Sequence, residues 1–230
     1  GVAADLAEAA VDEETRKAAK MREDLLTPIA KAWCTDMGVD VASLGVQIHG
    51  GMGFMNETLA GQLYRDSRIA PIYEGTNGIQ AIDLVGRKLT GTNGESMRVM
   101  LGEVEATAAD ARATNDPQLV QIADRLRAGA DALREASDWM LEAMKDRDQA
   151  KALAGATAYL ALAGDVIGGH FLTRAAVAAR SEDGSFRARQ LALAGFFAET
   201  VLATAPGRVY GITDGGSPFL ENSEALFGIA

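Results

Sequence analysis

Cysteine and histidine are scarce in this 230-residue sequence, and their scarcity argues against several kinds of site. Cys34 is the only cysteine, so no disulfide can form within the chain, which fits a reducing compartment. The two histidines, His49 and His170, are far apart and have no cysteine spacing beside them. The sequence therefore predicts no metal site, a small buried thiol at Cys34, and a core or interface role for His170.

Basic residues are outnumbered by acidic ones, 22 to 32, which leaves a net charge of −10. Nucleic acids and anionic lipid surfaces attract proteins with basic surfaces, so we expect no nucleic-acid partner and no membrane partner. No uninterrupted apolar run approaches the ~18 residues needed to span a bilayer, and the start shows no secretory pattern. The protein is therefore expected to be soluble and cytoplasmic.

Proline is also rare, whereas Ala, Leu, Glu, Arg and Met are abundant, which favours helix almost everywhere. The stretch from Leu6 to Met37 is predicted to be helical, with a kink or break at Pro28 and an end at Gly38. From Val39 to Ala81 glycines are frequent, which is typical of the loop-rich part of a helical protein, where sites usually lie.

A short helix over Ile79–Leu89 and a linker over Thr90–Gly94 are predicted to close this first part. Beyond the linker, apolar residues from Leu119 to Met144 follow a three-four spacing typical of an amphipathic helix, with Pro117 near its first turn. Residues 151–180 are apolar on more than one face, which predicts a central helix.

Residues 187–203 supply another helix, and the tail after Pro206 is predicted to be irregular. The fold class is therefore all-α, with one helical bundle over residues 1–90 and a second, of about four helices with its tail, over residues 95–230.

Single residues indicate little by themselves. A glutamate before a turn, such as Glu74, is usually only solvated, and a glycine cluster such as Gly50-Gly51-Met52-Gly53 is more often a plain turn. His49 beside that cluster is similar to the oxyanion segment of lipases, but the chain has no Gly-x-Ser-x-Gly sequence to supply a nucleophile. A hydrolase is therefore not favoured.

Three segments in register are more specific than any single residue. They are Gln47-Ile48-His49-Gly50-Gly51-Met52-Gly53-Phe54, Tyr64-Arg65-Asp66-Ser67-Arg68-Ile69 and Ile72-Tyr73-Glu74-Gly75-Thr76-Asn77-Gly78-Ile79-Gln80. Their order and intervals resemble the signature block of the acyl-CoA dehydrogenase family.

The resemblance implies that Glu74 is the catalytic base. It would remove the α-proton of an acyl-CoA thioester while the β-carbon gives a hydride to FAD, and the product would be the trans-2-enoyl-CoA. Such a carboxylate needs a dry slot, where its basicity rises, and a polarised thioester carbonyl, to which the backbone N–H of the base contributes in the family. Tyr73 and Gly75 would lie beside the substrate.

The same resemblance assigns the FAD contacts. The implied positions near the adenosine diphosphate end, commonly that of a neighbouring subunit, and after the base are Gln47, Gly50, Gly51, Thr76, Asn77 and Gly78. Arg65 and Asp66 are interpreted as a structural ion pair.

The amino-terminal helical domain and the middle β-domain of complete family members are not found in these residues. We therefore expect the chain alone to be an inactive fragment that binds FAD weakly or not at all. Stoichiometric flavin absorbance in the purified chain would contradict this expectation.

The long helical extension resembles a soluble bacterial group of the family that includes the 3-methylmercaptopropionyl-CoA dehydrogenases. The implied partners are an acyl-CoA substrate, an electron-transferring flavoprotein and a second copy, in a homodimer or a dimer of dimers. Two alternatives are a non-catalytic helical assembly module and a flavoprotein relative with another task, such as an oxidase or a DNA-damage-response homologue. The negative charge disfavours the nucleic-acid branch, and an intact segment around Glu74 favours the enzyme.

Overall fold

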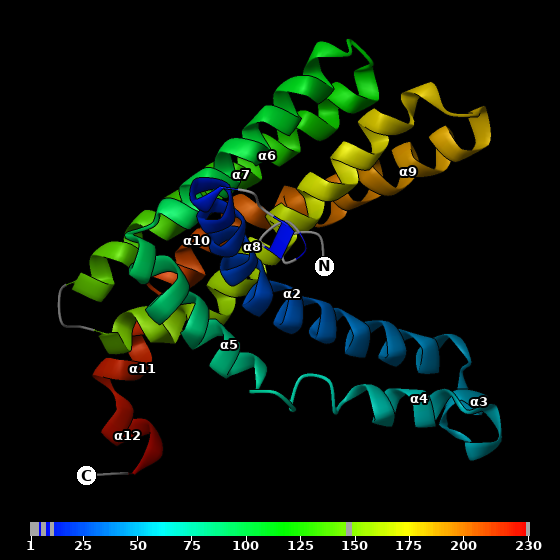
Figure 1. Cartoon of the computed structure of the whole chain (residues 1–230). Coiled ribbons are helices and arrows are strands. Elements are labelled where there is room, and N and C mark those ends of the chain that lie inside the picture. The colour runs from blue at the N-terminus through cyan, green and yellow to red at the C-terminus, as the bar shows by residue number, and fades with distance from the viewer. Residues whose placement is uncertain (1–4, 6–7, 10–11, 146–148, 229–230) are drawn as a thin grey trace. The chain divides into compact units, whose positions relative to one another are not determined.

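A computed structural model describes residues 5, 8–9, 12–145 and 149–228, and these residues are mostly helical with no strand among them (Figure 1). The predicted all-α class is therefore confirmed. The chain divides into two compact units, residues 1–84 and 85–230, which we call the loop unit and the bundle unit.

The loop unit is built on one long helix, α2 (Glu13–Ile48). Asp12 caps it by accepting a hydrogen bond from the backbone N–H of Thr15 at 2.8 Å, as N-cap aspartates do. The helix runs through Pro28 and Gly38, so the predicted end at Gly38 is wrong, and of the kink or break predicted at Pro28 there is no break. Pro28 is buried in the packed face of α2, and packing there outweighs the low helix propensity of proline. The predicted start at Leu6 lies outside the described residues.

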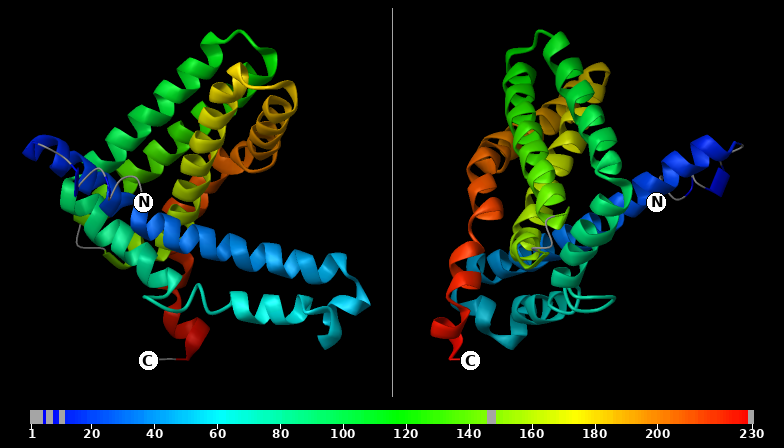
Figure 2. Two further views of the ribbon diagram at one scale, coloured as in Figure 1. Left: turned by 45° about the vertical axis from the view of Figure 1, so that its right-hand side comes forward. Right: turned by 90° about the vertical axis from the view of Figure 1, so that its left-hand side faces the viewer.

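After α2 the chain reverses and returns alongside it (Figures 1 and 2). The returning elements are α3 (Gly51–Phe54), η1 (Asn56–Thr58), α4 (Ala60–Ser67) and α5 (Asn77–Asp83). All three returning α-helices pack against α2. The predicted irregular stretch is therefore much shorter than expected, because only residues 68–76 form a long connection without helix.

The predicted helix over Ile79–Leu89 begins earlier, at Asn77, and changes its winding part-way. After Asp83 the chain continues as a π-helical turn, η2 (Leu84–Leu89), and then as η3 (Thr90–Thr92). The division between the two units falls inside η2, between Leu84 and Val85.

The bundle unit contains four long helices: α6 (Glu95–Ala113), α7 (Pro117–Lys145), α8 (Gln149–Ala178) and α9 (Gly184–Thr200). They match the predicted count, and α7 begins at Pro117 as expected. Figure 2 shows α6, α7 and α8 lying lengthwise beside one another, and each of the three contacts the other two. Of the amphipathic stripe on α7, Leu119, Ile122, Leu126, Leu133 and Met140 are buried.

The tail after Pro206 is helical, so the predicted irregular tail is wrong. Short turns η4 (Ala179–Ser181) and η5 (Leu202–Thr204) flank α9, and α10 (Ala205–Thr213), α11 (Ser217–Glu221) and α12 (Ser223–Phe227) follow. Pro206 is in the first turn of α10, where its missing N–H costs nothing. Val209 and Ile212 are buried on α10, which packs against α7 and α8, and that burial stabilises the helix despite its glycines.

The stretch from Gln149 to Ser181 is long and apolar enough to cross a membrane by length and composition. However, 67% of its apolar window is buried inside the structure. Its apolar character is that of the central helix of a bundle, as predicted for residues 151–180.

Glycines let α8 and α10 approach closely. A Cβ added to Gly155 would lie 2.3 Å from the carbonyl oxygen of Ile212, a backbone atom that cannot move aside alone. We expect Gly155→Ala to lower the free energy of unfolding by about 1–3 kcal/mol, the usual cost of overpacking. Chemical denaturation of the protein measures this value.

Gly102→Ala in α6 is the matched control, because a Cβ there meets no atom within 4 Å. We expect it to stabilise the protein by about 0.5–1 kcal/mol, since alanine is the better helix former. Equal effects of the two substitutions would contradict the close approach of α8 and α10.

Candidate active site

The connection between α4 and α5 has an unusual backbone at Glu74 and Gly75. Their φ angles are 54° and 83°, in the left-handed region. Glycine adopts such angles freely, but a residue with a side chain does so at a cost of roughly 1–3 kcal/mol. Glu74 therefore keeps this conformation only because contacts around it impose it.

Two side chains hold the carbonyl groups of this turn. The Gln80 side-chain amide donates to the carbonyl oxygen of Glu74 at 3.0 Å. The Lys31 ammonium on α2 donates to the carbonyl oxygen of Gly75 at 2.8 Å. Successive carbonyls are thus held from two different helices.

Asn77, the first residue of α5, ties the turn to α2. Its side-chain oxygen accepts from the Lys31 ammonium at 2.8 Å. Its side-chain nitrogen lies within hydrogen-bond distance of the Ala32 carbonyl (3.1 Å), the Thr35 hydroxyl (3.0 Å) and the Asp36 carboxylate (2.7 Å). This half-buried amide is fully engaged inside the loop unit.

The turn leaves three consecutive backbone donors available. In the part of the chain that the structure describes, the N–H groups of Glu74, Gly75 and Thr76 donate to no protein group. The next N–H, that of Asn77, donates to the Pro71 carbonyl at 3.0 Å. Consecutive free N–H groups around a left-handed turn form a concave surface that suits an anion or a polarised carbonyl oxygen.

The Glu74 side chain is exposed, as are Tyr73 and Gly75 beside it. The dry slot expected around the base is therefore not formed by the described residues themselves. What this chain supplies is the carboxylate, its rigid backbone and the adjacent N–H donors.

Gln47, Gly50 and Gly51 lie together at the far end of α2. Gly50 has φ 59° and ψ −143°, a combination accessible essentially only to glycine, and it turns the chain into α3. Gly53 packs α3 onto α2, because a Cβ there would lie 2.2 Å from the carbonyl oxygen of Val46. Gly51 has open space where a side chain would be, so other molecules can approach its backbone.

The predicted FAD residues thus fall into two clusters. Gln47 comes 11 residues after Asp36, the most carboxy-terminal α2 residue that Asn77 contacts. At 1.5 Å per residue, the two clusters are on the order of 16 Å apart along the helix. The structure brings Glu74, Gly75, Thr76, Asn77 and Gly78 together in one turn and keeps Gln47, Gly50 and Gly51 away from it.

Two other predicted roles change. Cys34 is exposed rather than buried. Arg65 and Asp66 are adjacent on α4, where neighbouring side chains point in different directions, and no ion pair joins these two described residues, so that prediction is wrong. His170 is buried on α8, as expected for a core histidine, with its ring 4.9 Å from that of Phe171.

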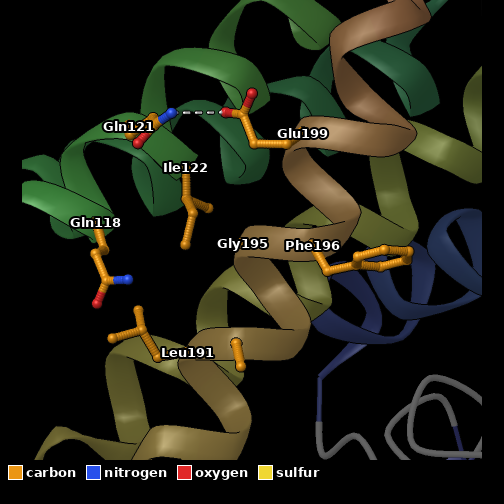
Figure 3. Close-up of a pocket in the computed structure, with 8 residues that line it drawn as sticks. Gln118, Gln121, Ile122, Leu191, Gly195, Phe196 and Glu199 are labelled. Carbon is orange, nitrogen blue, oxygen red and sulfur yellow. Dashed lines mark hydrogen bonds between the residues drawn. The ribbon is translucent and has the colours of Figure 1, made fainter.

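The bundle unit has a separate groove of about 260 Å³ between α7 and α9 (Figure 3). Its carboxylate, Glu199, accepts hydrogen bonds from Gln121 at 3.1 Å and Arg125 at 3.2 Å. The Arg125 guanidinium holds the pKa of the Glu199 carboxyl below its ordinary value. This carboxylate is already paired, so the groove offers no free base to compare with Glu74.

Comparison with known proteins matches two family descriptions to different parts of the chain. Residues 2–90 match the family described as "Acyl-CoA dehydrogenase, C-terminal domain", and residues 100–222 match "Acetyl-CoA dehydrogenase C-terminal like". The chain belongs to the acyl-CoA dehydrogenase family. The turn at Glu74 lies inside the first match, and the second match runs from within α6 to the end of α11.

Individual relatives extend over both units. The chain is 40% identical over 92% of its length to 3-methylmercaptopropionyl-CoA dehydrogenase of Ruegeria pomeroyi. It is 28% identical over 89% of its length to the broad-specificity linear acyl-CoA dehydrogenase of Mycobacterium tuberculosis. It spans 36% and 35% of the lengths of these two proteins.

A third relative matches a shorter part. The Caffeyl-CoA reductase-Etf complex subunit CarC of Acetobacterium woodii is 36% identical over 26% of this chain and 16% of its own length. The family is therefore shared by enzymes with different acyl groups, and membership alone leaves the substrate open.

Sequence reasoning missed the residues that hold the turn. Gln80 stands in the recognised segment without an assigned role, and its spacing of six residues from Glu74 was a local signal that could have revealed it. Lys31, Thr35 and Asp36 carry no such signal, because more than 40 residues separate them from the turn they contact.

The Asn77 contacts predict a measurable loss of stability. Asn77→Ala removes the side-chain bonds to α2, and we expect the free energy of unfolding to fall by about 1–3 kcal/mol. Asn77→Asp should cost more, because a carboxylate cannot donate to the Ala32 carbonyl and would lie beside Asp36.

The control is Asn56→Ala, since the exposed Asn56 side chain makes no bond within the described residues. A change within about 0.5 kcal/mol is expected there. Denaturant unfolding of the three variants compares them, and an Asn77→Ala effect no larger than that of Asn56→Ala would show that the amide is not an anchor.

Proposed function

We propose that this chain is the base-bearing portion of an FAD-dependent acyl-CoA dehydrogenase, with Glu74 as the base. The observation that carries the proposal is the left-handed turn at Glu74 and Gly75, with its free N–H groups beside an exposed carboxylate. A strained backbone that is held by several contacts is typical of functional sites.

The chemistry required at this turn has two parts. The α-proton of a thioester is weakly acidic, so a carboxylate must be positioned against it. The thioester oxygen gains negative charge as the proton leaves, and backbone N–H groups stabilise that charge if they are already aimed at it. Glu74 supplies the carboxylate, and the N–H groups of Glu74, Gly75 and Thr76 are the available donors.

FAD, when bound, would accept the hydride from the β-carbon. The residues present fit such a cofactor, because Gly50 adopts a glycine-only conformation and the backbone of Gly51 is open to close approach. Gln47, Gly50 and Gly51 would hold the adenosine diphosphate end. Thr76, Asn77 and Gly78 would lie near the cofactor beside the base, with Asn77 acting through its backbone because its side chain is bound to α2.

The substrate class is an acyl-CoA thioester, and we propose a linear or methylthio-substituted acyl group. The relatives that match both units are named for such acyl groups. An electron-transferring flavoprotein is the proposed electron acceptor, in line with the Etf complex named for one relative. We further propose that the complete enzyme is a cytoplasmic homodimer or dimer of dimers.

A non-catalytic assembly module explains the turn less well. A module that only packs helices gains nothing from a glutamate held at φ 54°, which costs stability. An enzyme gains a positioned base and a set of aimed donors from the same conformation.

The test is Glu74→Gln in the complete enzyme that contains this chain. Glutamine keeps the size of the side chain but cannot accept the α-proton. We expect anaerobic bleaching of the flavin absorbance by acyl-CoA thioesters to slow by at least ~10²-fold, the low end for losing a general base. The panel should include linear thioesters and 3-methylmercaptopropionyl-CoA.

Glu57→Gln is the matched control, because Glu57 is another exposed glutamate of the loop unit, and its side chain makes no hydrogen bond or ion pair within the described residues. Both variants should retain the wild-type content of FAD. A Glu74→Gln variant that bleaches as fast as wild type would refute the base assignment.

A further inference from the structure

His49 stands among the residues proposed to hold the adenosine diphosphate end of FAD, but its own side chain has no role in that proposal. It is the C-cap of α2, with Gln47 before it and Gly50 and Gly51 directly after it. Its side chain is exposed. What the imidazole ring can offer to a ligand depends on which of its two nitrogens is already bonded.

One ring nitrogen of His49 is in use. Nδ1 lies 2.8 Å from the carbonyl oxygen of Gly45, one turn back along α2. A carbonyl oxygen only accepts hydrogen bonds, so Nδ1 carries the proton and donates. In the neutral ring the other nitrogen, Nε2, is then an acceptor. Within the described residues, Nε2 makes no hydrogen bond, so this acceptor is available to a ligand.

The backbone that carries His49 is held by close packing. α3 packs against α2. A Cβ added to Gly53 would lie 2.2 Å from the carbonyl oxygen of Val46 and 3.0 Å from the Cβ of His49, so glycine is needed for this approach. The packing of α3 and the bond to Gly45 together restrict the ring. A group whose direction is set before binding loses less conformational freedom when a ligand arrives.

The chain on either side of His49 exposes large apolar side chains. Ile48 is 83% exposed and Phe54 is 86% exposed, the highest fractions among the large apolar side chains that the structure describes. Met52 on α3 is also exposed. Apolar side chains with a few placed polar groups are typical of cofactor sites. Adenosine has the matching chemistry, because its base is planar with apolar faces and its edges carry N–H and O–H donors.

We propose that His49 is a cofactor-binding residue whose Nε2 accepts a hydrogen bond from the adenosine of FAD. The inference rests on the proposed function, because that proposal is what places Gln47, Gly50 and Gly51 near the adenosine diphosphate end. The pyrophosphate carries oxygen acceptors and no donor, so it does not suit Nε2 of the neutral ring. The partner of Nε2 is therefore the adenine amino group or a ribose hydroxyl.

Two substitutions separate the two ring nitrogens. His49→Asn has an amide nitrogen that can replace Nδ1 on the Gly45 carbonyl, but it has no acceptor in the place of Nε2. His49→Gln is longer and can bring an amide oxygen to that place. Calorimetric titration of the apo form of the complete enzyme with FAD measures the Kd. We expect a rise of about 3- to 10-fold for His49→Asn, the usual contribution of one neutral hydrogen bond, and a value within about 2-fold of wild type for His49→Gln.

Ser43→Ala is the matched control. Ser43 is an exposed polar residue of the same helix, and its side chain makes no hydrogen bond within the described residues. Its Kd for FAD should equal that of wild type. The inference is overturned if His49→Asn also binds FAD as tightly as wild type, or if His49→Gln loses as much affinity as His49→Asn.

Two analogues of FAD identify the donor. One has purine in place of adenine and lacks the amino group, and the other has a dideoxyribose and lacks the ribose hydroxyls. We expect one of them to bind wild type about 3- to 10-fold more weakly than FAD does. The same analogue should show no such loss with His49→Asn, because the bond is already absent there. Losses that are equally large in wild type and His49→Asn for both analogues overturn the inference.

These affinities do not depend on turnover, so the two proposals fail in different ways. If the proposed function fails, the complete enzyme binds no FAD, or Glu74→Gln bleaches as fast as wild type. If only the role of His49 fails, FAD is bound and Glu74→Gln is slow, while His49→Asn binds FAD as tightly as wild type.

Discussion

The side-chain amide of Asn77 is the interaction on which the loop unit depends. It joins the first residue of α5 to Ala32, Thr35 and Asp36 on α2, and it also receives the Lys31 ammonium. Because it lies directly after the turn, it fixes one end of a nine-residue connection that has no helix of its own. With that end fixed, Lys31 and Gln80 hold two successive carbonyl groups of the turn at Glu74 and Gly75.

The two units are stabilised in different ways. The bundle unit has a continuous apolar core from α6, α7, α8 and α10, in which even the Tyr159 hydroxyl is buried against Ser137 at 2.8 Å. The loop unit buries fewer large side chains, and its α2 helix exposes Met37, Val41, Leu44 and Ile48. Specific hydrogen bonds therefore do more to determine the structure of the loop unit than that of the bundle unit. This suits a site whose backbone donors must point in fixed directions and which depends less on overall stability.

Backbone strain is concentrated at Glu74, the residue that we propose as the base. A left-handed glutamate is unfavourable locally, and the contacts from α2 and α5 offset that cost. The same contacts present the carboxylate and the neighbouring N–H groups from one rigid segment. A base and its electrostatic partners that share a backbone keep their geometry without further reorganisation when a substrate binds.

The sequence by itself determined the helical class, the long apolar helices of the bundle unit and the family. The first two follow from local properties, propensity and apolar spacing over many residues, and the third from three motifs within about 35 residues. The motifs predicted a role for Glu74 through its neighbours. They did not predict its left-handed backbone conformation, because φ angles depend on contacts as well as on residue type.

Only the tertiary structure decided which residues hold that site. It carried α2 through Pro28 and Gly38, because a buried face outweighs propensity, and it made a helix of the tail at Pro206 for the same reason. It also brought Lys31 and Asp36 to a turn more than 40 residues away. Contacts between distant segments are set by how the helices pack, and no local pattern encodes that choice.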